Sequence, residues 1–282
     1  MYEKFVDGKK IRDFILKKIK PEFDEIKKRR NKVANISIFV IGENKVTDSF
    51  IKRKRLVAKN LEIDFMEFRY GENDITEKEL IKKIQEVSDI TDGIIVQLPL
   101  PLNFNTQKVL NSIPVNLDVD LLNEDTLNYF LEEQKQVDIL PPVSSAIYEI
   151  LKANKFNLKN KNILLVGYGK LVGQPMSLLF DNLDIKYVIL RSKTLNKNEL
   201  YKKADLIISG VGIPELIKPE MLKDKVALID AGTSTANQKI VGDISLNCID
   251  KSIFFSKTPG GVGPITIAII YKNLLNLIKK NI

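Results

Sequence analysis

Histidine and tryptophan are absent from this chain of 282 residues, and cysteine occurs once, as Cys248. Without histidine the chain lacks the side chain best suited to proton transfer near neutral pH, so proton chemistry must use Lys, Asp, Glu or Tyr. A single cysteine cannot form an internal disulfide and, with no histidine, leaves too few ligands for a typical zinc site. We therefore expect no bound metal and a place in the reducing cytoplasm.

Long apolar runs are also missing. The longest are strand-sized, far short of the roughly 20 residues that a membrane-spanning helix needs. The sequence starts MYEKFVDGKK, which lacks the apolar core of a signal peptide. We therefore expect a soluble protein without a membrane partner. Its length exceeds that of a typical single domain, which favours two domains.

Positive charge exceeds negative charge, with 44 Lys and Arg against 36 Asp and Glu, a formal net charge of +8. The excess could mark a nucleic-acid surface, or an enzyme with anionic ligands and a lysine-rich chain. We favour the enzyme because, outside the run at 52–55, basic residues are scattered along helical faces with acids between them. The sequence also shows no nucleic-acid-binding module or array of stacking aromatics.

Apolar residues alternate between helical and strand spacing, which predicts an α/β fold with mostly parallel sheets covered by helices. The first series is helix 9–30, strand 35–41, helix 45–60, strand 61–69, helix 76–88 and strand 93–97. The second is helix 144–154, strand 162–167, helix 171–182, strand 186–190, helix 197–203 and strands 205–209 and 225–230. A last amphipathic helix is expected at 265–280.

A glycine-rich turn follows the strand at 162–167 and opens the next helix. It reads Gly167-Tyr168-Gly169-Lys-Leu-Val-Gly173, an arrangement in which backbone amides and a helix N-terminus can hold a pyrophosphate. The G-x-G-x-x-x-G spacing is one residue longer than the usual fingerprint. In this strand-helix-strand context it indicates dinucleotide binding, although glycine turns also join strands to helices in proteins that bind nothing.

The residues that end the following strand discriminate between cofactors. An acid there holds the ribose 2′-hydroxyl of NAD, whereas basic residues suit the 2′-phosphate of NADP. The chain has Arg191, Ser192 and Lys193 at this place. The pattern favours NADP, and an ordinary cationic loop is the alternative.

A lysine interrupts the apolar stripe of the helix at 45–60. The stripe contains Val46, Phe50, Val57 and Leu61, and its spacing places Lys54 on the same inward face. Burial and neighbouring cations would lower the pKa of this lysine and make it a usable general base. Alternatively, its aliphatic stem could lie on the core while the amine reaches solvent.

Two further polar positions could contribute to a site. Gln97 ends the strand at 93–97, and open parallel sheets bind ligands outside the carboxyl ends of their strands. Its amide could orient a substrate or the Lys54 amine, or simply cap the strand. Asp118 and Asp120 share one face if their segment is extended, where a carboxylate could bind a planar amino-heterocycle. Exposed acids in a turn are the alternative.

The segment Pro259-Gly260-Gly261-Val-Gly-Pro264 combines three glycines with two prolines. It allows close approach of the backbone to a ligand and is a plausible place for the chain to cross between domains.

Taken in order, these segments resemble the methylenetetrahydrofolate dehydrogenase/methenyltetrahydrofolate cyclohydrolase family over nearly the whole chain. The matching pieces are residues 6–9 (VDGK), the Lys54 helix, 92–101 (DGIIVQLPLP), 118–120 (DVD), 172–176 (VGQPM), 191–194 (RSKT), 241–243 (VGD) and 259–266 (PGGVGPIT). GIIVQLPLP and PGGVGP are the most specific of them.

The resemblance implies a folate domain of residues 1–143 completed by the C-terminal helix at 265–282, and a Rossmann-type NAD(P)-binding domain of residues 144–264. The pterin would lie between them. In such enzymes hydride passes from 5,10-methylenetetrahydrofolate to NADP, and water then opens the methenyl product to 10-formyltetrahydrofolate. NAD is a possible cofactor, and the family usually forms homodimers through the dinucleotide domain.

The resemblance also implies roles for particular residues. Lys54 would be the acid/base of the water step, Gln97 would orient it, and Asp120 would bind the pterin. Further substrate contacts are implied for Phe50, Leu98, Pro259, Gly260 and Gly261. Cofactor contacts are implied for Gly167, Tyr168, Gly169, Gly173, Arg191, Ser192, Lys193, Thr233 and Thr266.

Several positions depart from the family pattern. Phe50 replaces a tyrosine and loses its hydroxyl, which bears on the cyclohydrolase step. Leu121 replaces a glycine, and residues 141–144 read PPVS where the family has proline-cysteine-threonine-proline. Residues 168–169 replace an arginine-serine pair, so a preference for NADP depends on residues 191–193. Two alternatives therefore stay open: an oxidoreductase with a non-folate substrate, and a silent paralogue that only binds ligand.

Overall fold

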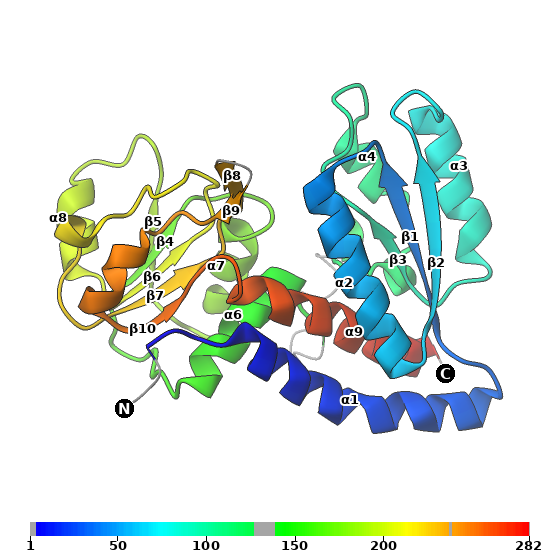
Figure 1. Cartoon of the computed structure of the whole chain (residues 1–282), viewed down its shortest axis with the longest axis horizontal. Helices are drawn as coiled ribbons and strands as arrows, with labels where there is room; N and C mark the ends of the chain where they lie inside the picture. Colours follow the sequence, from blue (N-terminus) through cyan, green and yellow to red (C-terminus); the bar gives the residue numbers. More distant parts are fainter. Residues whose placement is uncertain (1–3, 127–138, 237–238, 282) are drawn as a thin grey trace. The chain divides into compact units, whose positions relative to one another are not determined.

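Parallel β-sheets form the centres of the two units into which the chain divides (Figure 1). The computed structural model describes residues 4–126, 139–236 and 239–281. The three-strand unit comprises Phe14–Pro141 and Ile267–Ile282, and the five-strand unit comprises Met1–Asp13 and Pro142–Thr266. This architecture confirms the α/β class with parallel sheets.

The sheet of the three-strand unit has the order β2-β1-β3, with all strands parallel. Its strands are β1 (Asn35–Ile41), β2 (Asp64–Tyr70) and β3 (Ile94–Val96). All seven residues of β1 are buried, as a central parallel strand covered on both faces requires. The continuous apolar character of β1 therefore follows from its position in the sheet.

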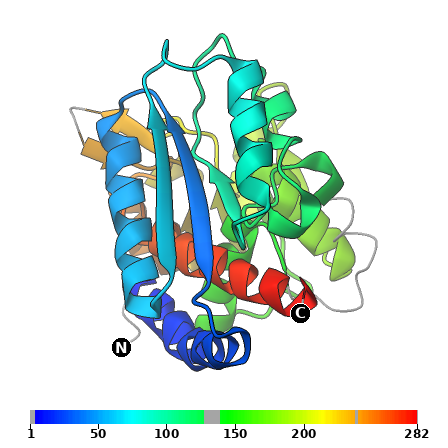
Figure 2. The same cartoon turned by 90° about the vertical axis from the view of Figure 1, so that its right-hand side faces the viewer.

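Helices cover both faces of this sheet, and Figure 2 shows the strands between α2 and α3. The helices are α1 (Gly8–Arg30), α2 (Lys45–Leu61), α3 (Glu77–Ser88), α4 (Thr106–Leu110) and α9 (Val262–Asn281). Buried residues of α1, α2 and α9 form one core with β1, and those of α3 and α4 form another on the opposite face. Helix α3 begins with a capping box between Thr76 and Glu79.

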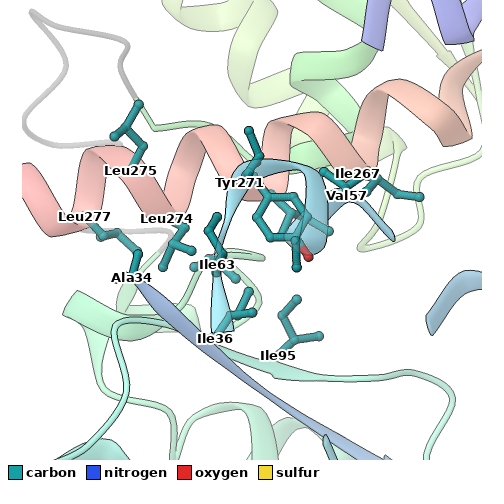
Figure 3. Packing of buried hydrophobic residues seen from close by; sticks show 14 of the residues in the cluster. Ala34, Ile36, Val57, Ile63, Ile95, Ile267, Tyr271, Leu274, Leu275 and Leu277 are labelled. Carbon is teal, nitrogen blue, oxygen red and sulfur yellow. The ribbon is translucent and has the colours of Figure 1, made fainter. Parts of the chain in front are cut away.

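The C-terminal helix contributes a fully buried tyrosine to the first of these cores. Tyr271 lies among apolar residues of the sheet and of α2, including Ile36, Val57 and Ile95 (Figure 3). Its hydroxyl donates a hydrogen bond of 2.7 Å to the main-chain oxygen of Lys54. A buried tyrosine hydroxyl needs such a partner, and this one ties α9 to the middle of α2.

The five-strand unit has the parallel order β10-β7-β6-β4-β5. Its strands are β4 (Ile163–Val166), β5 (Val188–Leu190), β6 (Leu206–Ser209), β7 (Val226–Asp230) and β10 (Ser252–Ser256). The helices are α6 (Pro142–Ala153), α7 (Gly173–Asn182) and α8 (Lys197–Lys203). Because β5 and β6 lie on opposite sides of β4, the chain switches direction there, and ligands bind at such points in open parallel sheets.

The predicted helices and strands are confirmed, with shifts at their ends. Strand β2 begins at Asp64 instead of residue 61, because Glu62 follows α2 in the left-handed conformation with φ +57°. Helix α9 begins at Val262 instead of residue 265, since proline is tolerated in a first helical turn. The short strand β10 and the hairpin of β8 (Ser234–Ala236) and β9 (Lys239–Val241) were not expected.

The N-terminal segment joins the five-strand unit, whereas we expected it in the folate domain of residues 1–143. The backbone N–H of Val6 donates to the Phe255 oxygen at 2.9 Å, and that of Gly8 donates to the Gly260 oxygen at 3.0 Å. Residues near the terminus thus pair with the edge strand β10 and the loop after it. The C-terminal division falls after Thr266, two residues beyond the expected end of the dinucleotide domain at 264.

Within the described part of the chain, no helix is long and apolar enough to cross a membrane.

A glycine in the three-strand unit offers a test of this packing. A Cβ atom on Gly93 would lie 2.7 Å from Val119 Cγ1 and 2.8 Å from Leu274 Cδ1, and both side chains are fully buried. We expect Gly93→Ala to lower the free energy of unfolding by about 1–3 kcal/mol through overpacking.

The matched control is Gly263→Ala in α9, where no atom lies within 4 Å of the added carbon. It should be neutral or raise stability by up to about 1 kcal/mol, since alanine favours helix. Urea unfolding monitored by circular dichroism compares the two variants. Equal stabilities would contradict the described packing around Gly93.

Candidate active site and dinucleotide site

The structure buries the Lys54 side chain, which is 7% exposed, on the inward face of α2. Val57 and Leu61 of the predicted stripe are buried with it, while the side chain of Val46 lies outside the described residues. Lys54 Nζ donates a hydrogen bond of 3.0 Å to Gln97 Oε1. The inward orientation predicted for Lys54 is therefore confirmed, and its amine does not reach solvent along the stem.

Gln97 reaches Lys54 from the carboxyl end of β3. Its backbone N–H donates to Phe39 O at 2.9 Å, which continues the pairing of β3 with β1. The side-chain Nε2 donates to Leu98 O at 2.9 Å, so the amide oxygen faces the lysine. A neutral acceptor orients the amine without supplying the negative charge that would hold it protonated.

Burial lowers the pKa of the Lys54 amine below its ordinary value, and the nearby Asp120 carboxylate partly opposes that shift. Burial likewise raises the pKa of Asp120, opposed by the charge of Lys54. Desolvation therefore pushes both groups towards their neutral forms. A lysine in this state can accept a proton at a pH where an exposed lysine cannot.

The two aspartates of residues 118–120 have different environments. Asp118 is fully buried, and its Oδ2 accepts a hydrogen bond of 2.9 Å from the Asn123 backbone N–H. Burial, with a smaller contribution from the Asp120 charge, raises the pKa of Asp118 to about 7. Asp120 is only partly buried and interacts with Lys54. Asp118 therefore anchors the following turn, and Asp120 belongs to the lysine site.

Leu121 occupies a left-handed backbone conformation, with φ +54°, while its side chain is buried in the core. This conformation explains why the resembling family has a glycine at this position. The chain retains the turn with a bulkier residue.

Phe50 precedes Lys54 by four residues, and Leu98 directly follows Gln97. Phe50 is one helical turn before Lys54 on α2 and half-buried, with the Arg53 guanidinium 5.9 Å from its ring centroid. Leu98 precedes Pro99 through a cis peptide bond and packs against the core beneath α3. The phenyl ring at position 50 offers no hydroxyl to a substrate or to Lys54.

The glycine turn of the five-strand unit has the geometry that the sequence predicted. Gly167 has φ +91°, a conformation that glycine adopts without strain. A Cβ atom on Gly173 would lie 2.3 Å from Gly167 O, so α7 starts in close contact with the turn. A Cβ atom on Gly169 would have no atom within 4 Å, which leaves the turn open to a ligand.

The turn after β5 lies beside this glycine turn, because Gly167 N–H donates to Leu190 O at 2.9 Å. Arg191, Ser192 and Lys193 are all exposed there. The Arg191 guanidinium lies 4.3 Å from the ring centroid of Tyr168. The structure therefore brings together the predicted glycine turn and the predicted basic turn.

The remaining predicted contacts also lie in the five-strand unit. Thr233 is exposed beyond the end of β7. Pro259 follows a cis peptide bond, and Gly260 has φ +107°. Thr266 Oγ1 donates within α9 to Val262 O at 3.2 Å. Pro259, Gly260 and Gly261 thus belong to a different unit from Lys54, Gln97 and Asp120.

Sequence reasoning gave no role to Asp243, which the structure identifies as the anchor of the loop after β6. Its Oδ1 accepts from the backbone N–H groups of Gly212 and Ile213, each at 2.9 Å. Its Oδ2 accepts from Val211 N–H and Ser209 Oγ, each at 2.7 Å. The sequence contains one indication of this role, which is a single acid within the mostly apolar run IVGDIS at 240–245. A carboxylate buried in such a run requires several hydrogen-bond donors.

The raised pKa of Asp118 predicts a pH dependence of stability. A carboxyl group whose folded pKa is about 7 binds a proton more tightly in the folded than in the unfolded chain, where the pKa is about 3.9. Its contribution is therefore fully present below about pH 4 and is lost as the pH rises towards 7. The Asp118→Asn side chain cannot ionise. Over this range its free energy of unfolding should therefore fall by less than that of the wild type, and the difference should reach up to about 4 kcal/mol.

Urea unfolding at several pH values between 4 and 7.5 measures this difference. Asp89→Asn, at an exposed aspartate after α3, removes the same charge and should keep the wild-type slope. A wild-type slope in Asp118→Asn would show that the buried carboxyl does not titrate in this range.

Comparison with known proteins matches both parts of the chain to one family. Residues 6–120 match the model of the tetrahydrofolate dehydrogenase/cyclohydrolase catalytic domain, and residues 141–282 match that of the NAD(P)-binding domain. The bifunctional protein FolD of Clostridium tetani is 33% identical over 97% of this chain and 99% of its own length. FolD of Hydrogenobaculum sp. is 33% identical over 98% of this chain and 99% of its own.

A solved structure of the bifunctional methylenetetrahydrofolate dehydrogenase/cyclohydrolase FolD from Campylobacter jejuni is similar over its full length. It has a TM-score of 0.90 and 28% identity, and the match covers 99% of each chain. These findings confirm the resemblance that the motifs predicted. The chain therefore belongs to the tetrahydrofolate dehydrogenase/cyclohydrolase family, as an enzyme with a catalytic domain and an NAD(P)-binding domain.

Proposed function

We propose that this enzyme oxidises 5,10-methylenetetrahydrofolate to 5,10-methenyltetrahydrofolate with NADP and hydrolyses the product to 10-formyltetrahydrofolate. It would thus be both an oxidoreductase and a hydrolase of one-carbon metabolism. The observation that carries the proposal is the buried Lys54 amine, bonded to Gln97 and near Asp120, in the catalytic domain of this family.

Lys54 would serve the water step. Its neutral amine accepts a proton from the water whose oxygen bonds to the methenyl carbon, and the resulting ammonium gives that proton to N5 as the bond from N5 to the carbon breaks. The remaining hydroxyl proton is released to solvent as the formyl C=O forms. Gln97 Oε1 holds one N–H of the amine, so the lone pair is directed by a fixed geometry. Without histidine in the chain, this lysine supplies the proton transfer near neutral pH.

Asp120 would bind the pterin. A carboxylate accepts two hydrogen bonds side by side, which matches the amino group and ring N–H of an aminopyrimidine edge. Its negative charge also keeps the Lys54 pKa from falling further. Phe50, Leu98, Pro259, Gly260 and Gly261 are the further substrate contacts that we propose.

The five-strand unit would hold NADP, whose bound nicotinamide accepts hydride from the methylene carbon. Backbone N–H groups of Tyr168, Gly169 and Gly173 would meet the pyrophosphate, because the turn is open at Gly169 and leads into α7. Gly167, whose own N–H is bonded to Leu190 O, would contact the cofactor through its close backbone approach. The basic turn at 191–193 would take the 2′-phosphate. No acid occurs from residue 191 to 197, which disfavours NAD without excluding it. Thr233 and Thr266 are the further contacts that we propose.

We further propose that the enzyme is a cytoplasmic homodimer. Strand β5 is an edge of the five-strand sheet, and Val188 on it is 46% exposed, while Leu195 in the following turn is 83% exposed. Exposed apolar side chains along a sheet edge favour self-association. Cys248 is buried as a free thiol, as suits a reducing compartment. Light scattering on the protein as it elutes from a size-exclusion column measures its mass and so tests the dimer. The mass of a monomer at micromolar concentration would contradict it.

An assay of both chemical steps tests the proposed activity. Purified protein is mixed with 5,10-methylenetetrahydrofolate and NADP, and reduced cofactor and methenyl product are followed together by absorbance. In Lys54→Ala we expect the hydrolysis rate to fall by about 10²–10⁴-fold, because the general base is lost, and the methenyl product to accumulate. In the wild type, hydrolysis should rise with pH as the amine loses its proton, with a midpoint below the ordinary lysine pKa of about 10.4.

Two further variants sharpen this test. Phe50→Tyr restores a hydroxyl one turn before Lys54 and should speed hydrolysis. Lys59→Ala, at an exposed lysine of the same helix, should leave both rates unchanged. Wild-type hydrolysis by Lys54→Ala would contradict the role of the lysine. A wild type that reduces neither NADP nor NAD would contradict the dehydrogenase assignment.

A further inference from the structure

An aromatic ring of the glycine turn supports the arginine of the basic turn. Tyr168 is 37% exposed, and the Arg191 guanidinium lies over its ring, 4.3 Å from the centroid. The two residues follow β4 and β5, which are neighbouring parallel strands. The Gly167 to Leu190 hydrogen bond fixes the distance between their backbones. The stacking is therefore built into the carboxyl edge of the sheet.

The backbone of the basic turn is held in place independently of this contact. Arg191 N–H donates to Thr194 Oγ1 at 2.8 Å, and Thr194 N–H donates to Arg191 O at 3.1 Å. Lys197 Nζ donates to Ser192 O at 2.7 Å. Movement of the arginine is thus confined to its long side chain.

The guanidinium itself retains its hydrogen-bonding capacity. Among the residues that the structure describes, it forms no ion pair and no hydrogen bond, and the Tyr168 ring is its contact. Glu199, the first acid after β5, is paired with Lys203 at 2.5 Å. A guanidinium has five N–H donors in a planar fork, which matches two oxygens of a phosphate. A cation that is held on one face and unpaired at its edge is arranged to receive an anion.

We propose that Tyr168 is a positioning residue that carries the Arg191 guanidinium at the place of the cofactor 2′-phosphate, so that the pair sets the preference for NADP over NAD. The inference rests on the proposed cofactor site. Stacking restricts the rotamers of a flexible side chain, which lowers the entropy that is lost when the phosphate binds. The tyrosine ring is uncharged, so its effect on the phosphate passes through the arginine. The arginine that the resembling family has at position 168 is thus replaced by one held from the neighbouring turn.

Binding of two small probes to the full chain tests this pair without any folate. Adenosine 2′,5′-bisphosphate contains the 2′-phosphate, and adenosine 5′-monophosphate lacks it. Calorimetric titration gives the affinity of each probe for the wild type, Tyr168→Leu, Tyr168→Phe, Arg191→Gln and the double variant Tyr168→Leu/Arg191→Gln. Circular dichroism confirms that each variant is folded.

For Arg191→Gln we expect the bisphosphate to bind roughly 10- to 100-fold more weakly, because a charged phosphate contact is lost. For Tyr168→Leu we expect a loss of about two- to fivefold, the size of an exposed cation–π contact. The monophosphate should bind these variants as it binds the wild type. Tyr168→Phe keeps the ring and should keep the wild-type affinity for both probes. In the Arg191→Gln background, Tyr168→Leu should have no further effect.

Three results would overturn the inference. An equal loss for both probes in Tyr168→Leu would mean that the ring contacts the adenosine. If Tyr168→Leu lowers the bisphosphate affinity as much in the Arg191→Gln background as in the wild type, the ring acts independently of the arginine. If neither probe binds the wild type, the proposed cofactor site itself fails, and the inference fails with it. Failure of folate turnover alone would leave these binding results intact.

Discussion

Parallel strand pairing is the constraint on which both units of this enzyme depend. A parallel strand needs a crossover to reach its neighbour, and the crossover helices cover both faces of the sheet. All seven residues of β1 are buried for this reason. Parallel pairing also places the carboxyl ends of the strands at one edge of each sheet. Gln97 follows β3 at such an edge, and the glycine turn and the basic turn follow β4 and β5 at another.

The chemistry that we propose for the three-strand unit depends on the burial of one lysine side chain. Burial lowers the Lys54 pKa, Gln97 orients the amine, and Asp120 limits the shift. The helix that carries the lysine is packed from the far end of the sequence, because Tyr271 donates to the Lys54 backbone across 217 residues. The C-terminal helix therefore contributes to the geometry of the lysine site as well as to the core. Burial also raises the pKa of Asp118, whose carboxylate accepts a hydrogen bond from the following turn.

In the five-strand unit, two exposed side chains meet at the edge of the sheet where we propose that the cofactor binds. An aromatic residue stands at position 168 and an arginine at 191, and the two are stacked. Asp243 holds the next turn along the same edge through four hydrogen bonds. The buried Asp243 carboxylate and the hydrogen bonds within the turns thus fix the backbone at this edge. The exposed side chains remain available to contact a ligand. If the proposed cofactor site is right, substitutions at the exposed positions would alter cofactor preference without disturbing the sheet.

The sequence by itself determined most of the helices and strands, the parallel class of the sheets and the family, because hydrophobic spacing and short motifs are local properties of the chain. It also indicated that Lys54 faces inward, since helical spacing decides which residues share a face. Only the tertiary structure decided that Lys54 meets Gln97, that Tyr271 reaches the Lys54 backbone, that Tyr168 stacks on Arg191 and that residues 4–13 join the five-strand unit. These contacts join segments that are distant in sequence, and they depend on which strands become neighbours and on the volumes that pack between them. The spacing of residues along one segment specifies neither the neighbours of a strand nor the volumes that pack against it.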